Sequence, residues 1–187
     1  MKKILLTILL LQLCPLFAEG TSEVAPITPV TAPRPARIEY LGILDLDGVK
    51  YGRILFVEQN EYTLFRERDS NEILEALTVA TDELTLFDKK LNMRRLVRKL
   101  DNVVLNDKEA LLKKALTGQT GIQKKGTLKE FLSTYTNTGL PIYLTPAIAK
   151  TAIDFSFEKI SLEELLKQFC GKSGIRIKID TDAVYLY

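Results

Sequence analysis

Two short motifs in the sequence are of types that carry chemistry in other proteins. Gly171-Lys172-Ser173 has the residues that close a phosphate-binding loop. Such a loop has a glycine five places upstream and precedes a helix, whereas this triplet lacks that glycine and follows a helical pattern. We therefore interpret it as a helix end. Asp45 and Asp47 are close together, but a calcium loop needs further acidic ligands and a closing glutamate, so Asp47-Gly48 is better explained as a hairpin turn.

The side chains that most often perform catalysis or bind metal are scarce. The chain has no histidine, which excludes His-based triads, HExxH zinc sites and most general-base schemes at neutral pH. Cys170 falls on an apolar helical stripe, so we interpret it as a small buried side chain rather than a reactive thiol. We predict no catalytic residue, no metal site and no cofactor.

One basic cluster stands out, at Arg94, Arg95, Arg98 and Lys99. Such a cluster is compatible with a patch for phosphate or lipid headgroups. A solvated strand, or a sheet edge protected by charge, is the interpretation that the pattern favours. Tyr185 and Tyr187 alternate with Val184 and Leu186 at the C-terminus, and they form either an exposed aromatic face or a second packed face of the last strand.

The first 18 residues have the pattern of a secretory signal peptide. Two lysines precede an apolar run too short to span a membrane, and small and turn residues follow up to Ala18, the expected cleavage site. We therefore predict a periplasmic protein. Cys14 leaves a second interpretation, a lipoprotein associated with the outer membrane, although Leu13 is larger than the residue that normally precedes a lipidated cysteine. Membrane association is expected only in that case.

Composition and charge indicate an ordinary folded chain without affinity for polyanions. The 187 residues are 46% hydrophobic and 27% charged, which suits one medium domain or two small ones. The formal charge of +2 includes Lys2 and Lys3, so the chain without its leader is close to neutral. No overall field favours nucleic acid or anionic membranes, and we expect no nucleic-acid partner. With Cys14 removed, Cys170 has no partner for an internal disulfide.

The rest of the chain divides by composition and residue pattern into four parts. Residues 19–37 are rich in proline and predict a semi-rigid tether. Residues 38–105 contain short extended segments separated by turn signals, which predicts a small β-sandwich or barrel. Residues 106–121 hold a short helix stopped by Gly118 and are interpreted as a connector. Residues 122–187 form the second domain, and together the two domains predict an α+β protein.

This second domain contains an internal repeat. Thr127 and Ser161 each precede a glutamate by three residues, the capping-box arrangement, and an apolar stripe at helical spacing follows each. Gly139 and Gly174 are expected to end the helices, and the alternating segments 140–144, 153–157, 175–179 and 183–187 are expected to be strands. Two helices packed on one face of a single small sheet would bury both stripes.

Leu128 to Tyr187 resembles the short N-terminal domain shared by secretins and TonB-dependent receptors, in its order of helix, glycine, strand, Ser-Leu-Glu-Glu-x-Leu helix and closing hairpin. The first domain carries a second resemblance. Its segment from Ile38 to Arg66 is similar to the periplasmic β-domain of type II secretion inner-membrane components and type IV pilus lipoproteins. The residues after it that fit this pattern are Asp69, Leu77, Asp82, Leu84 and Leu86, whereas Arg68 stands where that family has glycine.

These resemblances imply a non-enzymatic adaptor whose partner is a secretin or another secretion or pilus subunit of the cell envelope. The alternative is a signalling or ligand-sensing module beside a TonB-dependent receptor. Binding by strand-edge pairing or sheet-face docking is expected. The residues expected to bind a partner lie in the first and last strands: Ile38, Tyr40, Gly42, Val184, Tyr185, Leu186 and Tyr187.

Overall fold

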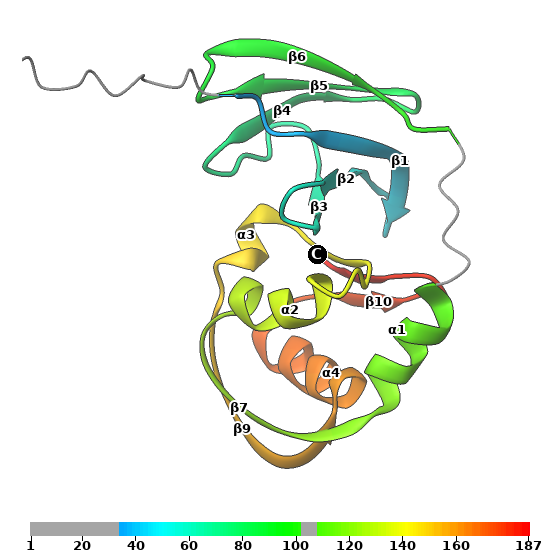
Figure 1. The fold of residues 1–187 in the computed structure, drawn as a ribbon, viewed down its shortest axis with the longest axis vertical. Helices are drawn as coiled ribbons and strands as arrows, with labels where there is room; N and C mark the ends of the chain where they lie inside the picture. The colour runs from blue at the N-terminus through cyan, green and yellow to red at the C-terminus, as the bar shows by residue number, and fades with distance from the viewer. Residues whose placement is uncertain (1–33, 102–107) are drawn as a thin grey trace, which may run out of the picture. The chain divides into compact units, whose positions relative to one another are not determined.

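The computed structural model describes residues 34–101 and 108–187, which form a mixed α+β fold (Figure 1). This confirms the predicted fold class. The predicted signal peptide with Cys14, most of the predicted tether and residues 102–107 lie outside the described residues. No helix within the described ranges is long and apolar enough to cross a membrane.

The first six strands form two antiparallel meanders: β1 (Ile38–Leu46), β2 (Val49–Phe56) and β3 (Glu61–Phe65), then β4 (Leu74–Val79), β5 (Glu83–Asp88) and β6 (Met93–Arg98). Apolar residues alternate along these strands, and Tyr40, Ile54, Leu84 and Leu86 pack between the two layers. Asp47 and Gly48 form the β1–β2 turn with positive φ angles of 54° and 80°, as the Asp-Gly pair predicts. Residues 74–79, which have helical propensity, are a strand as expected.

The second half contains four helices and five strands within its described residues: α1 (Lys108–Thr117), β7 (Gln119–Thr127), α2 (Leu128–Thr136), β8 (Ile142–Leu144), α3 (Pro146–Ala149), β9 (Ala152–Ser161), α4 (Leu162–Ser173), β10 (Ile177–Ile179) and β11 (Val184–Leu186). The capping box of α2 is complete, with reciprocal hydrogen bonds between Thr127 and Glu130. In α4, Ser161 caps Glu164 N–H, and Gly174 ends the helix at a φ of 72°. Helix α2 ends at Thr136, before Gly139.

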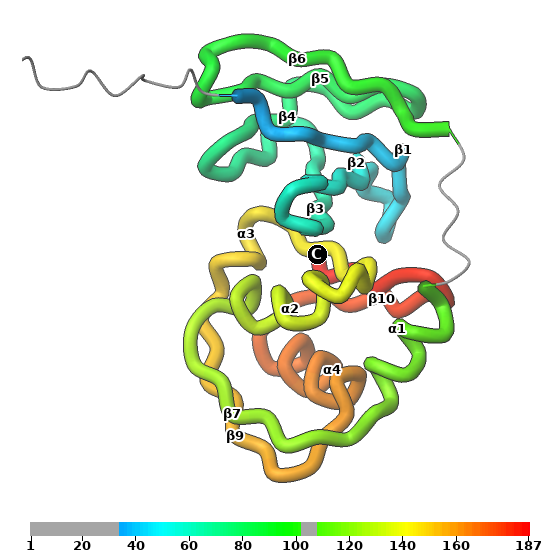
Figure 2. The backbone as a smooth tube through the Cα atoms, in the orientation of Figure 1, coloured from blue at the N-terminus to red at the C-terminus, as the bar shows by residue number. Residues whose placement is uncertain are grey.

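The expectation of a single sheet in this half is wrong. Strand β9 pairs with β7 in a two-stranded ribbon, whereas β8, β11 and β10 belong to another sheet. Figure 2 shows β7 and β9 running side by side past α4. We did not predict β7, because its sequence QTGIQKKGT is polar and only Ile122 is buried. Residues 119–121 of the expected connector are therefore part of a strand.

A six-stranded sheet joins strands from both halves in the order β1-β2-β3-β8-β11-β10. The junction is parallel and pairs Thr63 with Leu144. One face, including Ile142, Val184 and Leu186, packs with residues of α1, α2 and α4. The other face carries a core with side chains from both halves, in which the rings of Tyr143 and Tyr185 stack at 5.1 Å.

Candidate protein-binding strand edge

The last strand does not offer the open edge that the sequence suggested. Val184, Tyr185 and Leu186 are buried, and β11 lies between β8 and β10, so neighbouring strands pair with both of its edges. Of the two interpretations of the terminal tyrosines, the structure selects the packed face. Tyr187 is half-buried, and its hydroxyl donates a 2.9 Å hydrogen bond to Asp47 Oδ2.

The residues of the first strand that we expected to bind a partner also lie close to other parts of the fold. Ile38 is half-buried against the core between the meanders. Tyr40 is fully buried, its hydroxyl donates to Ala80 O at 2.5 Å, and burial raises its pKa to about 12. Gly42 lies in the β1 irregularity with a φ of 90°, where an added Cβ would be 3.1 Å from Lys99 Cε. The side chains of Ile38 and Tyr40 therefore contribute to packing within the protein, while β1 itself is an edge strand of the six-stranded sheet.

Strand β6, which carries the basic cluster, is an edge strand of its sheet (Figure 1). It pairs with β5 on one side. On its second side the described backbone contact is at the C-terminal end, where Lys99 forms a parallel bridge with Tyr40 and Leu100 N–H donates to Tyr40 O at 2.8 Å. This confirms the interpretation of the cluster as part of a sheet edge.

Two hydrogen bonds fix which backbone groups point to the open side of β6. Lys99 N–H donates to Asp82 O, toward β5, whereas Leu100 N–H donates to Tyr40 O, away from β5. Because the direction of N–H and C=O alternates along a strand, the amides of Arg95 and Val97 point toward β5 and those of Arg94 and Leu96 point to the second side. Within the described residues, no backbone partner lies against Arg94 or Leu96 on that side.

The side chains of β6 divide in the same alternating way. Val97 packs against the core between the meanders, while Leu96 on the opposite face is 57% exposed. Arg94 and Arg98 share this outer face and are exposed. Met93 at the start of the strand is 49% exposed. An edge strand that exposes apolar side chains beside unpaired backbone groups offers a template for pairing with another chain.

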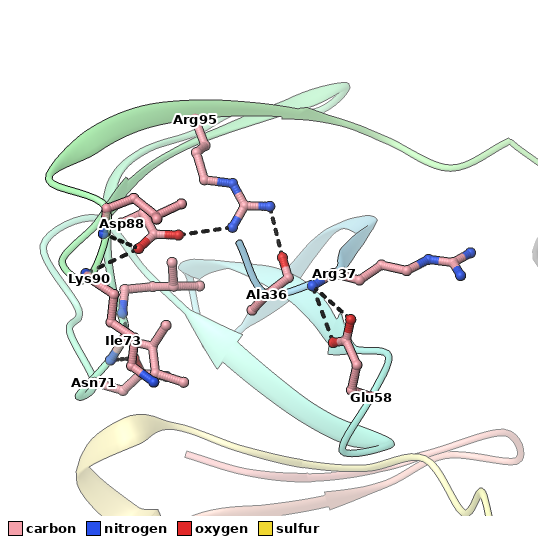
Figure 3. Close-up of polar contacts among 10 residues, drawn as sticks. Ala36, Arg37, Glu58, Asn71, Ile73, Asp88, Lys90 and Arg95 are labelled. Carbon is pink, nitrogen blue, oxygen red and sulfur yellow. Dashed lines mark hydrogen bonds and ion pairs between the residues drawn. The ribbon is translucent and has the colours of Figure 1, made fainter. Parts of the chain in front are cut away.

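A buried ion pair holds β6 in place (Figure 3). Arg95 Nη1 donates to Asp88 Oδ2 at 3.1 Å, and Arg95 Nη2 donates to Ala36 O at 2.8 Å. Asp88 Oδ1 also accepts hydrogen bonds from the backbone N–H groups of Lys90 and Leu91, both at 3.1 Å. The β5–β6 turn, β6 and the segment entering β1 are thereby joined around one carboxylate.

The described residues also line a pocket of about 490 Å³. Its lining includes the apolar side chains of Phe56 and Leu144, together with charged residues at Glu61 and Lys129. Lys129 Nζ lies 2.8 Å from Glu61 Oε2, and Lys150 Nζ lies 3.8 Å from Glu72 Oε1. Both lysines that line the pocket are therefore already paired with carboxylates.

The structure also shows where the remaining candidates for chemistry lie. Gly171-Lys172-Ser173 forms the last turn of α4, as the helix-end interpretation predicts. Cys170 is buried in the helix-covered core, and burial raises its pKa to about 11. Among the described residues, no group of three or more acidic or cysteine side chains is placed to hold a metal ion.

Comparison with known proteins identifies no family and finds distant structural similarity only. No family model matches the chain. No curated protein matches it either. Two crystal structures, at 1.65 and 2.50 Å resolution, of a protein described as "a putative anti-sigma factor from Parabacteroides distasonis" are similar at 12% sequence identity. For each, the TM-score is 0.31 over 82% of this chain and 68% of the other. Similarity this distant supports no functional argument.

Proposed function

We propose that this protein is a non-enzymatic interaction module of a cell-envelope assembly, an adaptor for a secretin, type II secretion or type IV pilus-like machine, and that β6 is where it binds another protein. The observation that carries the binding role is the open edge of β6 with Leu96 exposed beside it. Strand addition satisfies such backbone groups and covers such a side chain in one step. The envelope setting rests on the signal-peptide pattern and on the two family resemblances.

Crosslinking in intact cells tests this proposal. A photoreactive amino acid would replace Leu96 in the full-length chain, and a matched variant would carry it at Leu111 of α1, which is 54% exposed and thus similar in type and accessibility. We expect a crosslinked envelope secretion or pilus subunit from position 96 and not from position 111. Crosslinks to a TonB-dependent receptor would support the signalling alternative instead. Equal recovery from the two positions, or none from position 96, would contradict a binding role for β6.

A further inference from the structure

We infer that the protein pairs with a second copy of itself through the free edge of β10, in antiparallel register about Ile179. This contact is separate from the partner-binding edge proposed at β6 and does not depend on it. Three features of β10 carry the inference: the direction of its free backbone groups, the order of its charged residues, and the half-buried isoleucine between them.

The backbone of β10 has one paired side and one free side. Arg176 N–H donates to Tyr187 O at 2.9 Å, and Tyr187 N–H donates back to Arg176 O at 3.1 Å. Asp180 N–H donates to Ala183 O at 2.9 Å. Because backbone direction alternates along a strand, the N–H and C=O groups of Ile179 point away from β11. Among the strands that the structure describes, none pairs with this second side of β10, the last strand of its sheet.

The charged residues that flank Ile179 are self-complementary. Lys178 Nζ lies 3.3 Å from Asp180 Oδ2 in the same chain, and the two side chains are 43% and 37% exposed. In antiparallel pairing about Ile179, Lys178 of each copy is directly opposite Asp180 of the other. The four charges then alternate in sign around the two-fold axis, with each ammonium between two carboxylates. Opposite charges directly across a sheet are stabilising, and a network stabilises more than an isolated pair.

Ile179 supplies the apolar contact at the centre of this interface. Its side chain is half-buried against the helix-covered core. Residues directly opposite each other in paired strands contact each other, so the two copies of Ile179 would cover the exposed part of each other's side chain. The N–H of each would donate to the C=O of the other, which gives a two-fold symmetric pair that closes as a dimer.

Other pairings of these edges are less complementary. A register centred on Lys178 would place two ammonium groups directly opposite each other, which is destabilising. Two β6 strands pairing antiparallel about Leu96 would place Arg94 of one copy opposite Arg98 of the other. A helix satisfies its backbone groups internally and would leave those of Ile179 without partners. The charges therefore favour self-pairing at β10 and not at β6.

The decisive experiment exchanges the two charges between separate variants. Sedimentation equilibrium of the purified protein over a series of concentrations measures self-association. Lys178→Glu alone and Asp180→Lys alone each place like charges opposite each other, so each should raise the dimer dissociation constant roughly tenfold or more. When the two variants are mixed, opposite charges face each other again at both positions. The mixture should therefore form a heterodimer about as tightly as the wild type forms its homodimer.

The matched control makes the same charge changes at two exposed neighbours in β9, Lys159→Glu and Glu158→Lys. Both should associate like the wild type, alone and mixed. In the wild type, backbone hydrogen exchange at Ile179 should slow as the protein concentration rises, whereas exchange at Lys178, which faces β11, should not depend on concentration.

Three outcomes would overturn the inference: a monomer at every concentration, equal association of the β9 and β10 variants, or failure of the mixed β10 variants to form a heterodimer. None of these outcomes bears on the proposed function, since crosslinking at Leu96 reports on β6 alone.

Discussion

Arg95 Nη1 lies 3.1 Å from Asp88 Oδ2, and the Asp88 carboxylate is almost completely buried. Because Asp88 also accepts two backbone hydrogen bonds, this pair ties the conformation of the β5–β6 turn to the position of β6. Strand β6, which we propose as the binding edge, is therefore held by a contact with β5, its neighbour in the same sheet.

Replacing Asp88 by alanine should lower the free energy of unfolding by about 2 kcal/mol. The substitution leaves a partly buried guanidinium and two backbone N–H groups without their acceptor. Urea unfolding followed by circular dichroism measures the change. Glu83→Gln, an exposed carboxylate on the same strand, is the control and should change stability by less than about 0.5 kcal/mol. If the Asp88 substitution lowered the free energy of unfolding by no more than the control does, the buried pair would not be important for stability.

The Cys170 thiol should react slowly with a disulfide reagent in the native protein. Burial raises its pKa to about 11, so at a given pH below 9 the thiolate fraction is about 100-fold smaller than for a thiol of pKa 9. Labelling would be followed on the Cys170-containing peptide by mass spectrometry, with and without urea. The neutral buried thiol stabilises the fold fully below the unfolded pKa, and this contribution declines as the pH rises toward 11. Rapid native labelling would show that the helix-covered core opens readily.

Glu130 should stabilise the fold at neutral pH and lose this effect in acid. Its pKa lies below the ordinary value because its carboxylate accepts the backbone N–H of Thr127 and interacts with the Thr127 side chain. A lowered folded-state pKa gives stability that is present above the unfolded pKa and is lost as the pH falls through the folded value. The Glu130→Gln variant should therefore unfold at lower urea concentration than the wild type at pH 7. The difference should shrink toward pH 3; a constant difference would indicate a cause other than charge.

The fragment 122–187 should not form a well-packed domain by itself, although the sequence pattern predicts it as a second domain. It lacks Leu112 and Leu116, which are buried in the same core as Leu166. It would also expose Tyr143 and Tyr185, which pack against side chains of β1, β2 and β3. We expect poor dispersion in the NMR spectrum of 122–187 and a folded spectrum for 34–187. Good dispersion and cooperative unfolding of the short fragment would contradict this.

The parts of the fold that sequence patterns predict well are those set by local chemistry. Helix α4 has its start specified by Ser161, its buried face by the apolar stripe, and its end by Gly174. Strand β7 is different because its position depends on pairing with β9 rather than on apolar alternation. The junction of Thr63 with Leu144 also has no local signal, since it joins strands far apart in the chain.

The candidate site was predictable only in part. The cluster from Arg94 to Lys99 indicates an edge strand, because charges at such density are rarely placed in the middle of a sheet. Which amides point outward depends on the contacts of Lys99 with Asp82 and of Leu100 with Tyr40, and these contacts are made by distant segments. The first and last strands looked equally available in the sequence, because alternation alone does not reveal how many neighbours a strand has.

The bridge between Tyr40 and Lys99 closes one end of the gap beside β6 and so limits the length of any ladder that forms there. A guest chain has room from Met93 to Val97, five residues at most, or about 17 Å at the usual rise of a strand. Affinity then has to come from a short footprint, and exchange of one partner for another should be fast.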